Sequence, residues 1–196
     1  MRLARWTPFL CLAALLVLVG CGSRPTSRTP NYGTSGRYYP PPGPPEDPWG
    51  PYIMQASSRF GVPDLWIREV MRRESAGQQE AYSSAGAMGL MQVMPGTYAE
   101  LQARHGLGDD PWDPRNNILA GTAYIREMYD RYGAPGFLAA YNAGPRRLEA
   151  YLSNRRDLPD ETVNYVAAIA PRLGRSTPMS GPLAVYADAG APVVAA

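Results

Sequence analysis

The stretch Ile67-Arg68-Glu69-Val70-Met71-Arg72-Arg73-Glu74-Ser75 carries the pattern that decides the fold class. Ile67, Val70 and Met71 lie seven, four and three residues before Glu74. Residues at these spacings share one face of an α-helix, so the stretch predicts a helix with an apolar stripe. Glu74 continues that stripe, and we expect it to face the core or the wall of a cleft.

An acidic side chain on an apolar helix face has predictable chemistry. Burial disfavours the charged form of a carboxyl group, and the partial negative charge at the end of a helix acts in the same direction. We therefore expect a raised pKa at Glu74, as a general acid working near neutral pH requires. Two structural alternatives stay open from the residues alone: a core glutamate satisfied by hydrogen bonds, and a glutamate paired with an arginine.

The helical pattern extends on both sides of this stretch, over residues 51–173. Prolines with acidic residues open the expected helices and glycines close them, as Asp113-Pro114 and Gly133 do for the longest one. Seven helices are expected: up to Phe60, from Asp64 to about Ala76, from Pro95 to before Gly106, from Pro114 to before Gly133, and over 135–142, 145–153 and 160–170. No alternating apolar pattern is long enough to predict a sheet. The predicted fold class is mainly α, in a single domain.

The first residues have the features of an export signal. A basic start at residues 1–5 precedes an almost wholly apolar run over residues 9–20. This run is shorter than the about 20 residues that a membrane-spanning helix needs, so residues 1–20 are interpreted as a cleaved signal peptide. The run ends in Leu18-Val19-Gly20-Cys21, which resembles the bacterial lipobox and predicts lipidation of Cys21. An ordinary signal peptide followed by a chance cysteine is the alternative.

The residues that flank the helical region lack the composition of a core. Residues 21–50 are rich in Gly, Ser and Pro and are expected to form a disordered tether behind the lipidated cysteine. Residues 174–196, rich in Ala, Pro and Gly, are expected to form a loose tail.

Charge and metal-binding residues exclude some functions. Without Arg2 and Arg5, 17 of the 19 arginines remain against 17 acidic residues, and they form no basic cluster. Nucleic acid is therefore not an expected partner. With a single histidine, His105, and no cysteine cluster, no metal site and no cofactor are expected either.

Four sequence blocks, in this order, resemble the lytic transglycosylases of the soluble, goose-lysozyme-like class, whose catalytic unit is the SLT domain. The first block is Arg73-Glu74-Ser75 together with residues 83–95, SSAGAMGLMQVMP. The other blocks are Asp113-Pro114, Asn116-Asn117-Ile118 and Gly121; then residues 139–145, AAYNAGP; and last residues 159–166, PDETVNYV. The resemblance implies a lysozyme-like SLT domain of about seven helices over residues 51–173, in a lipoprotein.

The resemblance also implies roles for individual residues. The glutamate followed by serine is the sole catalytic acid of that family, which points to Glu74. The residues implied to bind the glycan are Ser75, Ser83, Gln92, Met94, Tyr141, Asn142, Glu161 and Tyr165. A structural role is the alternative for each of them; Asn142, for example, is also a candidate helix cap. The glycines Gly86 and Gly89 permit either close approach of a ligand or tight turns.

The implied reaction is non-hydrolytic cleavage of the bond between N-acetylmuramic acid and N-acetylglucosamine in peptidoglycan, which leaves 1,6-anhydro ends. The implied setting is the periplasm, with a lipid anchor at Cys21; Gly22 after the cysteine favours the outer membrane. A lysozyme-type hydrolase on the same fold is one alternative, and its second carboxylate would be Glu80 or Glu161. A glycan-binding lipoprotein without catalytic activity is the other.

Overall fold

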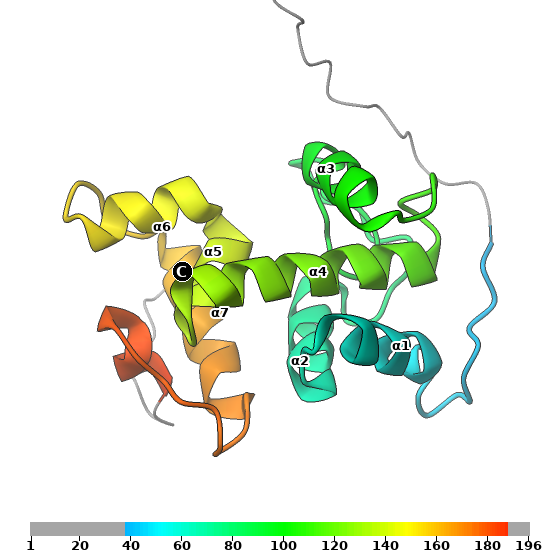
Figure 1. Ribbon diagram of the computed structural model, residues 1–196, viewed down its shortest axis with the longest axis horizontal. Helices are drawn as coiled ribbons and strands as arrows, with labels where there is room; N and C mark the ends of the chain where they lie inside the picture. The colour runs from blue at the N-terminus through cyan, green and yellow to red at the C-terminus, as the bar shows by residue number, and fades with distance from the viewer. Residues whose placement is uncertain (1–37, 188–196) are drawn as a thin grey trace, which may run out of the picture.

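Helix α4 (Pro114–Tyr132) crosses the middle of the structure, a computed structural model that describes residues 38–187 (Figure 1). Helices α1 to α3 lie around one end of α4, and α5 to α7 lie around the other end (Figure 1). The remaining helices are α1 (Gly50–Phe60), α2 (Asp64–Ser75), α3 (Pro95–His105), α5 (Gly136–Ala143), α6 (Pro145–Leu152), α7 (Asp160–Ile169) and the 3-10 helices η1 (Ala170–Arg172) and η2 (Pro182–Ala187). The prediction of a mainly α domain with seven α-helices is confirmed, each helix lying within two residues of its expected bounds.

The helices begin and end where the sequence signals place them. The carboxylate of Asp113 caps α4, accepting hydrogen bonds from the backbone N–H groups of Arg115 (2.8 Å) and Asn116 (3.3 Å). Gly61 and Gly106 close α1 and α3 with φ angles of 63° and 59°. Helix α2 differs from this pattern, because Ala76 takes the left-handed conformation after its last residue, with φ 52°.

Helix α4 is buried over most of its surface and therefore organises the core. Ile118, Ala120 and Ile125 are fully buried. Gly121 lets α4 approach the glycine-rich segment closely, because a Cβ atom at this position would lie 2.5 Å from the Cβ of Met91. The position of α4 thus sets the position of residues 81–94, which contain isolated β-bridges and no β-strand.

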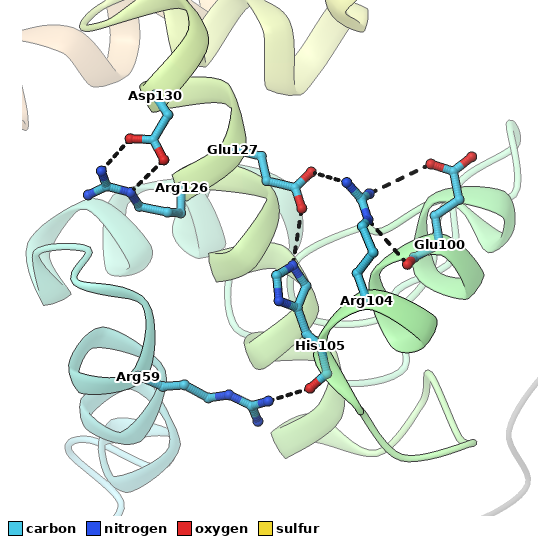
Figure 2. Close-up of polar contacts among 7 residues, drawn as sticks. All are labelled: Arg59, Glu100, Arg104, His105, Arg126, Glu127 and Asp130. Atoms are coloured by element: carbon cyan, nitrogen blue, oxygen red, sulfur yellow. Dashed lines mark hydrogen bonds and ion pairs between the residues drawn. The ribbon is translucent and has the colours of Figure 1, made fainter.

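A charged network joins α3 to α4 and α1, as Figure 2 shows. Glu127 of α4 accepts from Arg104 at 3.0 Å and contacts the ring nitrogen Nε2 of His105 at 3.1 Å. Arg59 of α1 donates to the backbone carbonyl of His105, and the ring of Phe60 packs edge-on against the histidine ring. His105 therefore has a structural place at a joint between three helices.

Both ends of the described region pack on the domain, in contrast to the expected tether and tail. Trp49 is 7% exposed and belongs to the hydrophobic core, and Leu183 of η2 is 2% exposed. The backbone N–H of Ser180 donates to the carbonyl of Ala134 at 2.8 Å. A buried apolar side chain in each segment is the physical reason for the docking.

The predicted signal peptide, Cys21 and the first part of the tether lie outside the described residues. Within residues 38–187, no helix is both long enough and apolar enough to cross a membrane.

Candidate active site

The carboxyl group of Glu74 lies in the last turn of α2, where this helix packs against α7. The hydroxyl of Tyr165, from the middle of α7, donates a hydrogen bond to Oε1 of Glu74 at 2.6 Å. Tyr165 is 3% exposed, so the bond forms in a largely water-free environment. A partly buried acid that is hydrogen-bonded to a buried phenol and forms no ion pair with another described residue can hold or release a proton.

The environment raises the pKa of Glu74 from 4.5 to about 7. Burial is the main cause, because it disfavours the carboxylate. The hydrogen bond from Tyr165 and the positive charge of Arg73 lower the pKa, and the negative charge of Glu161 raises it further. The prediction of a raised pKa from the stripe position is confirmed, and Glu74 is suited to general acid catalysis near neutral pH.

The glycine-rich segment forms the second wall of the candidate site. It meets the end of α2, where Ser75 donates to the carbonyl of Leu90 at 2.7 Å, and Asn117 of α4 holds its backbone. The side-chain Nδ2 of Asn117 donates to the carbonyls of Met88 and Pro111, both at 2.9 Å. Its Oδ1 accepts from the backbone N–H of Met91 at 2.7 Å. Asn117 is fully buried, so these three bonds replace the β-ladder that the segment lacks.

Gly89 shows why this segment needs glycine. Its φ angle is 73°, and a Cβ atom on it would lie 2.6 Å from Nδ2 of Asn117. Of the two uses that the sequence left open, the close approach is therefore to an internal side chain rather than to a ligand.

A cavity of about 320 Å³ opens between the glycine-rich segment and the end of α5. Four of the predicted glycan-binding residues line it: Gln92, Met94, Tyr141 and Asn142. The other lining residues are Val93, Thr97, Tyr124, Ala143, Gly144 and Pro145. Tyr141 connects the cavity to the acid, because the charge of Glu74 contributes to the raised pKa of the Tyr141 hydroxyl, after burial.

The polar groups of the cavity are partly used by the protein itself. Gln92, with φ 47°, donates from Nε2 to the carbonyls of Ala81 and Gly89, both at 2.9 Å, which leaves its Oε1 as an acceptor. The Oδ1 of Asn142 accepts from the hydroxyl of Thr162 at 2.7 Å, which leaves its amide hydrogens as donors. Each side-chain amide therefore has one group available for a ligand: the oxygen of Gln92 and the NH₂ group of Asn142.

Helix α5 ends on glycine rather than on asparagine. Gly144 closes it with φ 83°, and the N–H of Gly144 donates to the carbonyl of Ala140 at 3.0 Å. The alternative reading of Asn142 as a helix cap is therefore wrong.

Residues 51–164 match the protein family described as "Transglycosylase SLT domain", which is more than half of the chain. The chain belongs to this family. Glu74, the glycine-rich segment and the Tyr141–Asn142 pair all lie within the matched residues.

Several relatives share this SLT domain. The transglycosylase of Enterobacteria phage PRD1 is 32% identical over 146 residues, which are 74% of this chain and 50% of the phage protein. The soluble lytic murein transglycosylase of Escherichia coli K12 is 36% identical over 100 residues, covering 47% of this chain and 16% of that protein. The membrane-bound lytic murein transglycosylase C of Haemophilus influenzae PittGG is 32% identical over 131 residues, covering 59% and 37%. The chain spans half or less of the length of these relatives.

Solved structures of the family have the same fold. The 70 kDa soluble lytic transglycosylase of Escherichia coli matches with a TM-score of 0.57 and 29% identity, over 71% of this chain and 24% of that chain. An inactive mutant of the lytic transglycosylase Slt from Pseudomonas aeruginosa matches with a TM-score of 0.56 and 29% identity, over 69% and 25%. The predicted lysozyme-like SLT fold is confirmed.

Two serines of the SLT site turn inward. The Oγ of Ser75 donates to the carbonyl of Leu90 at 2.7 Å and accepts from the N–H of Gly77 at 3.1 Å. The Oγ of Ser83 accepts from the N–H of Ala87 at 2.9 Å, within a tight turn. Neither serine lines the cavity, so the structure places both hydroxyls in the support of the glycine-rich segment and its junction with α2.

The acidic candidates also differ in their surroundings. Glu161 is exposed in the first turn of α7 and acts on Glu74 through its charge. Glu80 is exposed in the loop after α2. No group of metal-binding side chains occurs within the part of the chain that the structure describes.

Two residues of the candidate site were not predicted from the sequence. Tyr124 lines the cavity, and its ring lies 5.3 Å from that of Tyr141 at an angle of 52°. Asn117 was part of a quoted block but received no role. Its position next to Ile118, inside an apolar stripe, is a signal that a buried amide there needs partners.

Proposed function

We propose that this chain is a lytic transglycosylase, a carbon–oxygen lyase that cleaves the glycan strands of peptidoglycan. The observation that carries the proposal is the protonatable Glu74, bonded to Tyr165 at 2.6 Å in an SLT domain with an adjoining cavity. Relatives of the chain bear the names soluble and membrane-bound lytic murein transglycosylase. The proposed bond is the one between N-acetylmuramic acid and N-acetylglucosamine, and the proposed product carries a 1,6-anhydro-muramyl end.

The first chemical step uses Glu74 as an acid. A pKa of about 7 keeps a large fraction of the group protonated at neutral pH. The proton passes to the glycosidic oxygen, the bond from muramyl C1 to that oxygen breaks, and the N-acetylglucosamine side leaves with a hydroxyl group. The N-acetyl group of the muramyl sugar stabilises the positive charge that develops at C1.

The second step uses the resulting carboxylate as a base. It removes the proton of the muramyl C6 hydroxyl while that oxygen bonds to C1, which closes the anhydro ring and returns Glu74 to its protonated form. No water is consumed. The hydroxyl of Tyr165 stabilises the carboxylate between the two steps, because its hydrogen bond favours the charged form.

The cavity supplies groups that suit an amino sugar. The free Oε1 of Gln92 can accept from an acetamido N–H, and the free amide hydrogens of Asn142 can donate to an acetamido carbonyl. Met94, 43% exposed, and the ring of Tyr124 offer apolar surface to a sugar face. These residues, with Tyr141, are the proposed glycan contacts.

A lysozyme-type hydrolase is the nearest alternative, and one observation favours it: the charge of Glu161 reaches Glu74. A hydrolase uses a second carboxylate to activate water or to attack the sugar. Product analysis separates the two reactions. Purified sacculi are digested in water enriched in heavy oxygen, and the released muropeptides are analysed by mass spectrometry. We expect anhydro ends without heavy oxygen; reducing muramyl ends that carry heavy oxygen would establish hydrolysis instead.

The same digestion of sacculi tests whether Glu74 is the catalytic acid. Glu74→Gln keeps the size of the side chain and removes its proton chemistry, so we expect release to fall by about a thousandfold. A Slt structure of Pseudomonas aeruginosa with a glutamate-to-glutamine change is described as an inactive mutant, which supports this expectation. Unchanged release by Glu74→Gln would remove Glu74 from the mechanism, and absence of release by the wild type would favour a glycan-binding lipoprotein.

We further propose that the protein acts in the periplasm, anchored through lipidated Cys21 to the outer membrane. The sequence Leu18-Val19-Gly20-Cys21-Gly22 and the membrane-bound relative support this placement. Expression of the full chain with and without Cys21→Ser tests it. The wild type is expected in the outer-membrane fraction with incorporated labelled fatty acid, and the variant in the soluble periplasmic fraction. Equal fractionation of both proteins would contradict the anchor.

A further inference from the structure

Residues 38–49, here named the strap, lie outside the family match and along the surface of the domain. The family match begins at residue 51, so the strap is an addition to the matched SLT domain. It runs from the connection between α3 and α4 to the start of α1 (Figure 1). The hydroxyl of Tyr39, near its start, donates to Oδ2 of Asp110 at 2.5 Å.

Contacts with α1 and α2 hold the second half of the strap in place. Arg68 of α2 donates two hydrogen bonds to the carboxylate of Asp47, at 2.6 and 2.9 Å. The same carboxylate leaves no room for a side chain at Gly50, where a Cβ atom would lie 2.1 Å from Oδ2 of Asp47. Trp49 is buried in the core. Paired charges and a buried aromatic ring fix this end of the strap against α1 and α2.

Trp49 contacts the chain directly after the catalytic helix. Its indole Nε1–H donates to the carbonyl of Gly77 at 3.0 Å. The N–H of Gly77 in turn donates to Oγ of Ser75 at 3.1 Å, and Ser75 donates to the carbonyl of Leu90 at 2.7 Å. Both backbone polar groups of Gly77 are therefore held, one by the strap and one by the residue next to Glu74.

The turn held in this way is made of two consecutive residues with positive φ, Ala76 at 52° and Gly77 at 81°. A left-handed conformation is unfavourable for alanine, so the turn depends on contacts from outside. A hollow of about 380 Å³ lies between the strap and the end of α2. Beside this hollow, the bond from Trp49 and the pair of Asp47 with Arg68 connect the strap to α2 and to the turn that follows it.

We propose that Trp49 is a positioning residue for Glu74, and that the strap is a working part of the active site rather than the end of a passive tether. The proposal rests on the function proposed above. Trp49 fixes Gly77, Gly77 fixes Ser75, and the end of α2 thereby presents the Glu74 carboxyl group to the substrate at a constant place. Misplacement of a catalytic group by about 1 Å reduces a rate by up to about a hundredfold.

Loss of the Trp49 bond has a second consequence at the acid. The charged and titratable groups around Glu74 are Arg73 of α2, Tyr141 of α5, and Glu161 and Tyr165 of α7. None of them changes in a Trp49 variant. A loosened turn admits water beside Glu74, and since burial is the main cause of its raised pKa, that pKa falls. The alkaline limb of the activity profile then moves to lower pH.

The experiment compares Trp49→Phe with Trp66→Phe in the full chain. Trp66 is a matched control: it is 5% exposed, and its Nε1–H donates to the carbonyl of Leu173 at 3.0 Å, away from Gly77. Each variant keeps an aromatic ring and loses one indole hydrogen bond. Initial rates of muropeptide release from sacculi are measured from pH 4.5 to 9, together with thermal unfolding.

We expect Trp49→Phe to lower kcat about tenfold with little change in KM, and to move the alkaline limb down by about half a pH unit. Trp66→Phe is expected to lose about as much thermal stability as Trp49→Phe. It is expected to keep the kcat of the wild type and the alkaline limb of its pH profile. If the two variants have the same kcat, the same alkaline limb of the pH profile and the same thermal stability, the proposal is overturned. If the wild-type protein releases no muropeptides, the proposed function is overturned instead.

A second pair of variants covers the case in which Trp49→Phe does not fold. Asp47→Asn weakens the strap at a partly exposed ion pair, and Asp130→Asn makes the same change in the pair of Arg126 and Asp130 on α4 (Figure 2). Asp47→Asn is expected to lower kcat by two- to threefold, on the order of a weakened ion pair near the surface, and to shift the alkaline limb of the pH profile in the same direction as Trp49→Phe does. Asp130→Asn is expected to change neither. Identical profiles for both variants would contradict a positioning strap.

Discussion

The two walls of the candidate active site are built by different means. The acid wall consists of α2 and α7, two regular helices that meet at the bond between Glu74 and Tyr165. The glycine-rich wall, residues 81–94, has no regular element, and polar side chains hold its backbone: Ser75, Ser83, Gln92 and Asn117. In the first wall a polar side chain is available for chemistry, because the helices already satisfy their backbone. In the second wall, the polar side chains form hydrogen bonds with backbone groups that no regular element satisfies, so fewer of their polar atoms are available for chemistry.

This difference predicts that substitutions in the glycine-rich wall act on stability, whereas substitutions in the acid wall act on rate and pH dependence.

Asn117→Ala is expected to have the largest effect on stability. It leaves the N–H of Met91 and the carbonyl of Pro111 without their buried partner, and it removes one of the two donors to the carbonyl of Met88, which keeps the N–H of Val93 at 3.1 Å. An unsatisfied buried group costs about 1–3 kcal/mol, so we expect the free energy of unfolding to fall by about 3 kcal/mol or more. Urea denaturation measures this change. Asn116→Ala is the control, since Asn116 donates a single side-chain bond, to the carbonyl of Asp110 at 3.2 Å. Equal losses in both variants would contradict a special role for Asn117.

The pH dependence of stability sharpens the description of the acid wall. Glu74 has a folded-state pKa of about 7 against 4.5 unfolded, so the folded protein binds the proton more tightly. Its contribution to stability is complete below pH 4.5 and is lost as the pH rises through about 7, by up to about 3 kcal/mol. Glu74→Gln lacks this loss and is expected to gain stability relative to the wild type between pH 4.5 and 7.5. Parallel unfolding curves at every pH would show that Glu74 does not titrate near neutrality.

Tyr165→Phe is expected to change rate more than stability. Without the phenol, the carboxylate loses its hydrogen-bond donor, so the pKa of Glu74 rises and the alkaline limb of kcat/KM moves to higher pH. We expect kcat to fall about tenfold, because the carboxylate that forms when Glu74 donates its proton in the first step is less stabilised. The direction of the limb is opposite to that expected for Trp49→Phe, so one set of profiles distinguishes the two effects. Tyr98→Phe, which removes a buried hydroxyl bonded to Gly108 at 2.7 Å, is expected to leave the limb in place.

The contrast between the walls also explains which parts of the molecule could be predicted from sequence. Helices are local patterns, so the stripe ending at Glu74 and the Pro and Gly signals predicted all seven α-helices and the burial of the acid. The side-chain support of the glycine-rich wall joins residues far apart in the chain. Met91 and Asn117 are 26 residues apart, and no periodic pattern relates them.

The strap and the C-terminal segment could not be predicted for the same reason. Their proline, glycine and alanine content is typical of linkers, although Trp49 and Leu183 are buried and Met179 and Tyr186 pack against the core. The partner of Trp49 is the carbonyl of Gly77, 28 residues away. Every residue has a backbone carbonyl, so the sequence does not show which of them is the partner. The family match covers residues 51–164 and therefore does not include the strap.

The smallest expected effect concerns Glu161, the second carboxylate near the acid wall. It is exposed, and its charge is the least of the causes that act on the pKa of Glu74. Glu161→Gln is therefore expected to lower that pKa, moving the alkaline limb down by about 0.3 pH units, since exposed charges are screened by water and salt. We expect kcat to stay within about twofold of the wild type, and any contact of Glu161 with the glycan to appear in KM. Glu80→Gln, at the other exposed candidate, is the control and is expected to leave the profile unchanged. A loss of release approaching that of Glu74→Gln would identify Glu161 as a second catalytic carboxylate and would favour hydrolysis, because only a hydrolase of this fold needs two.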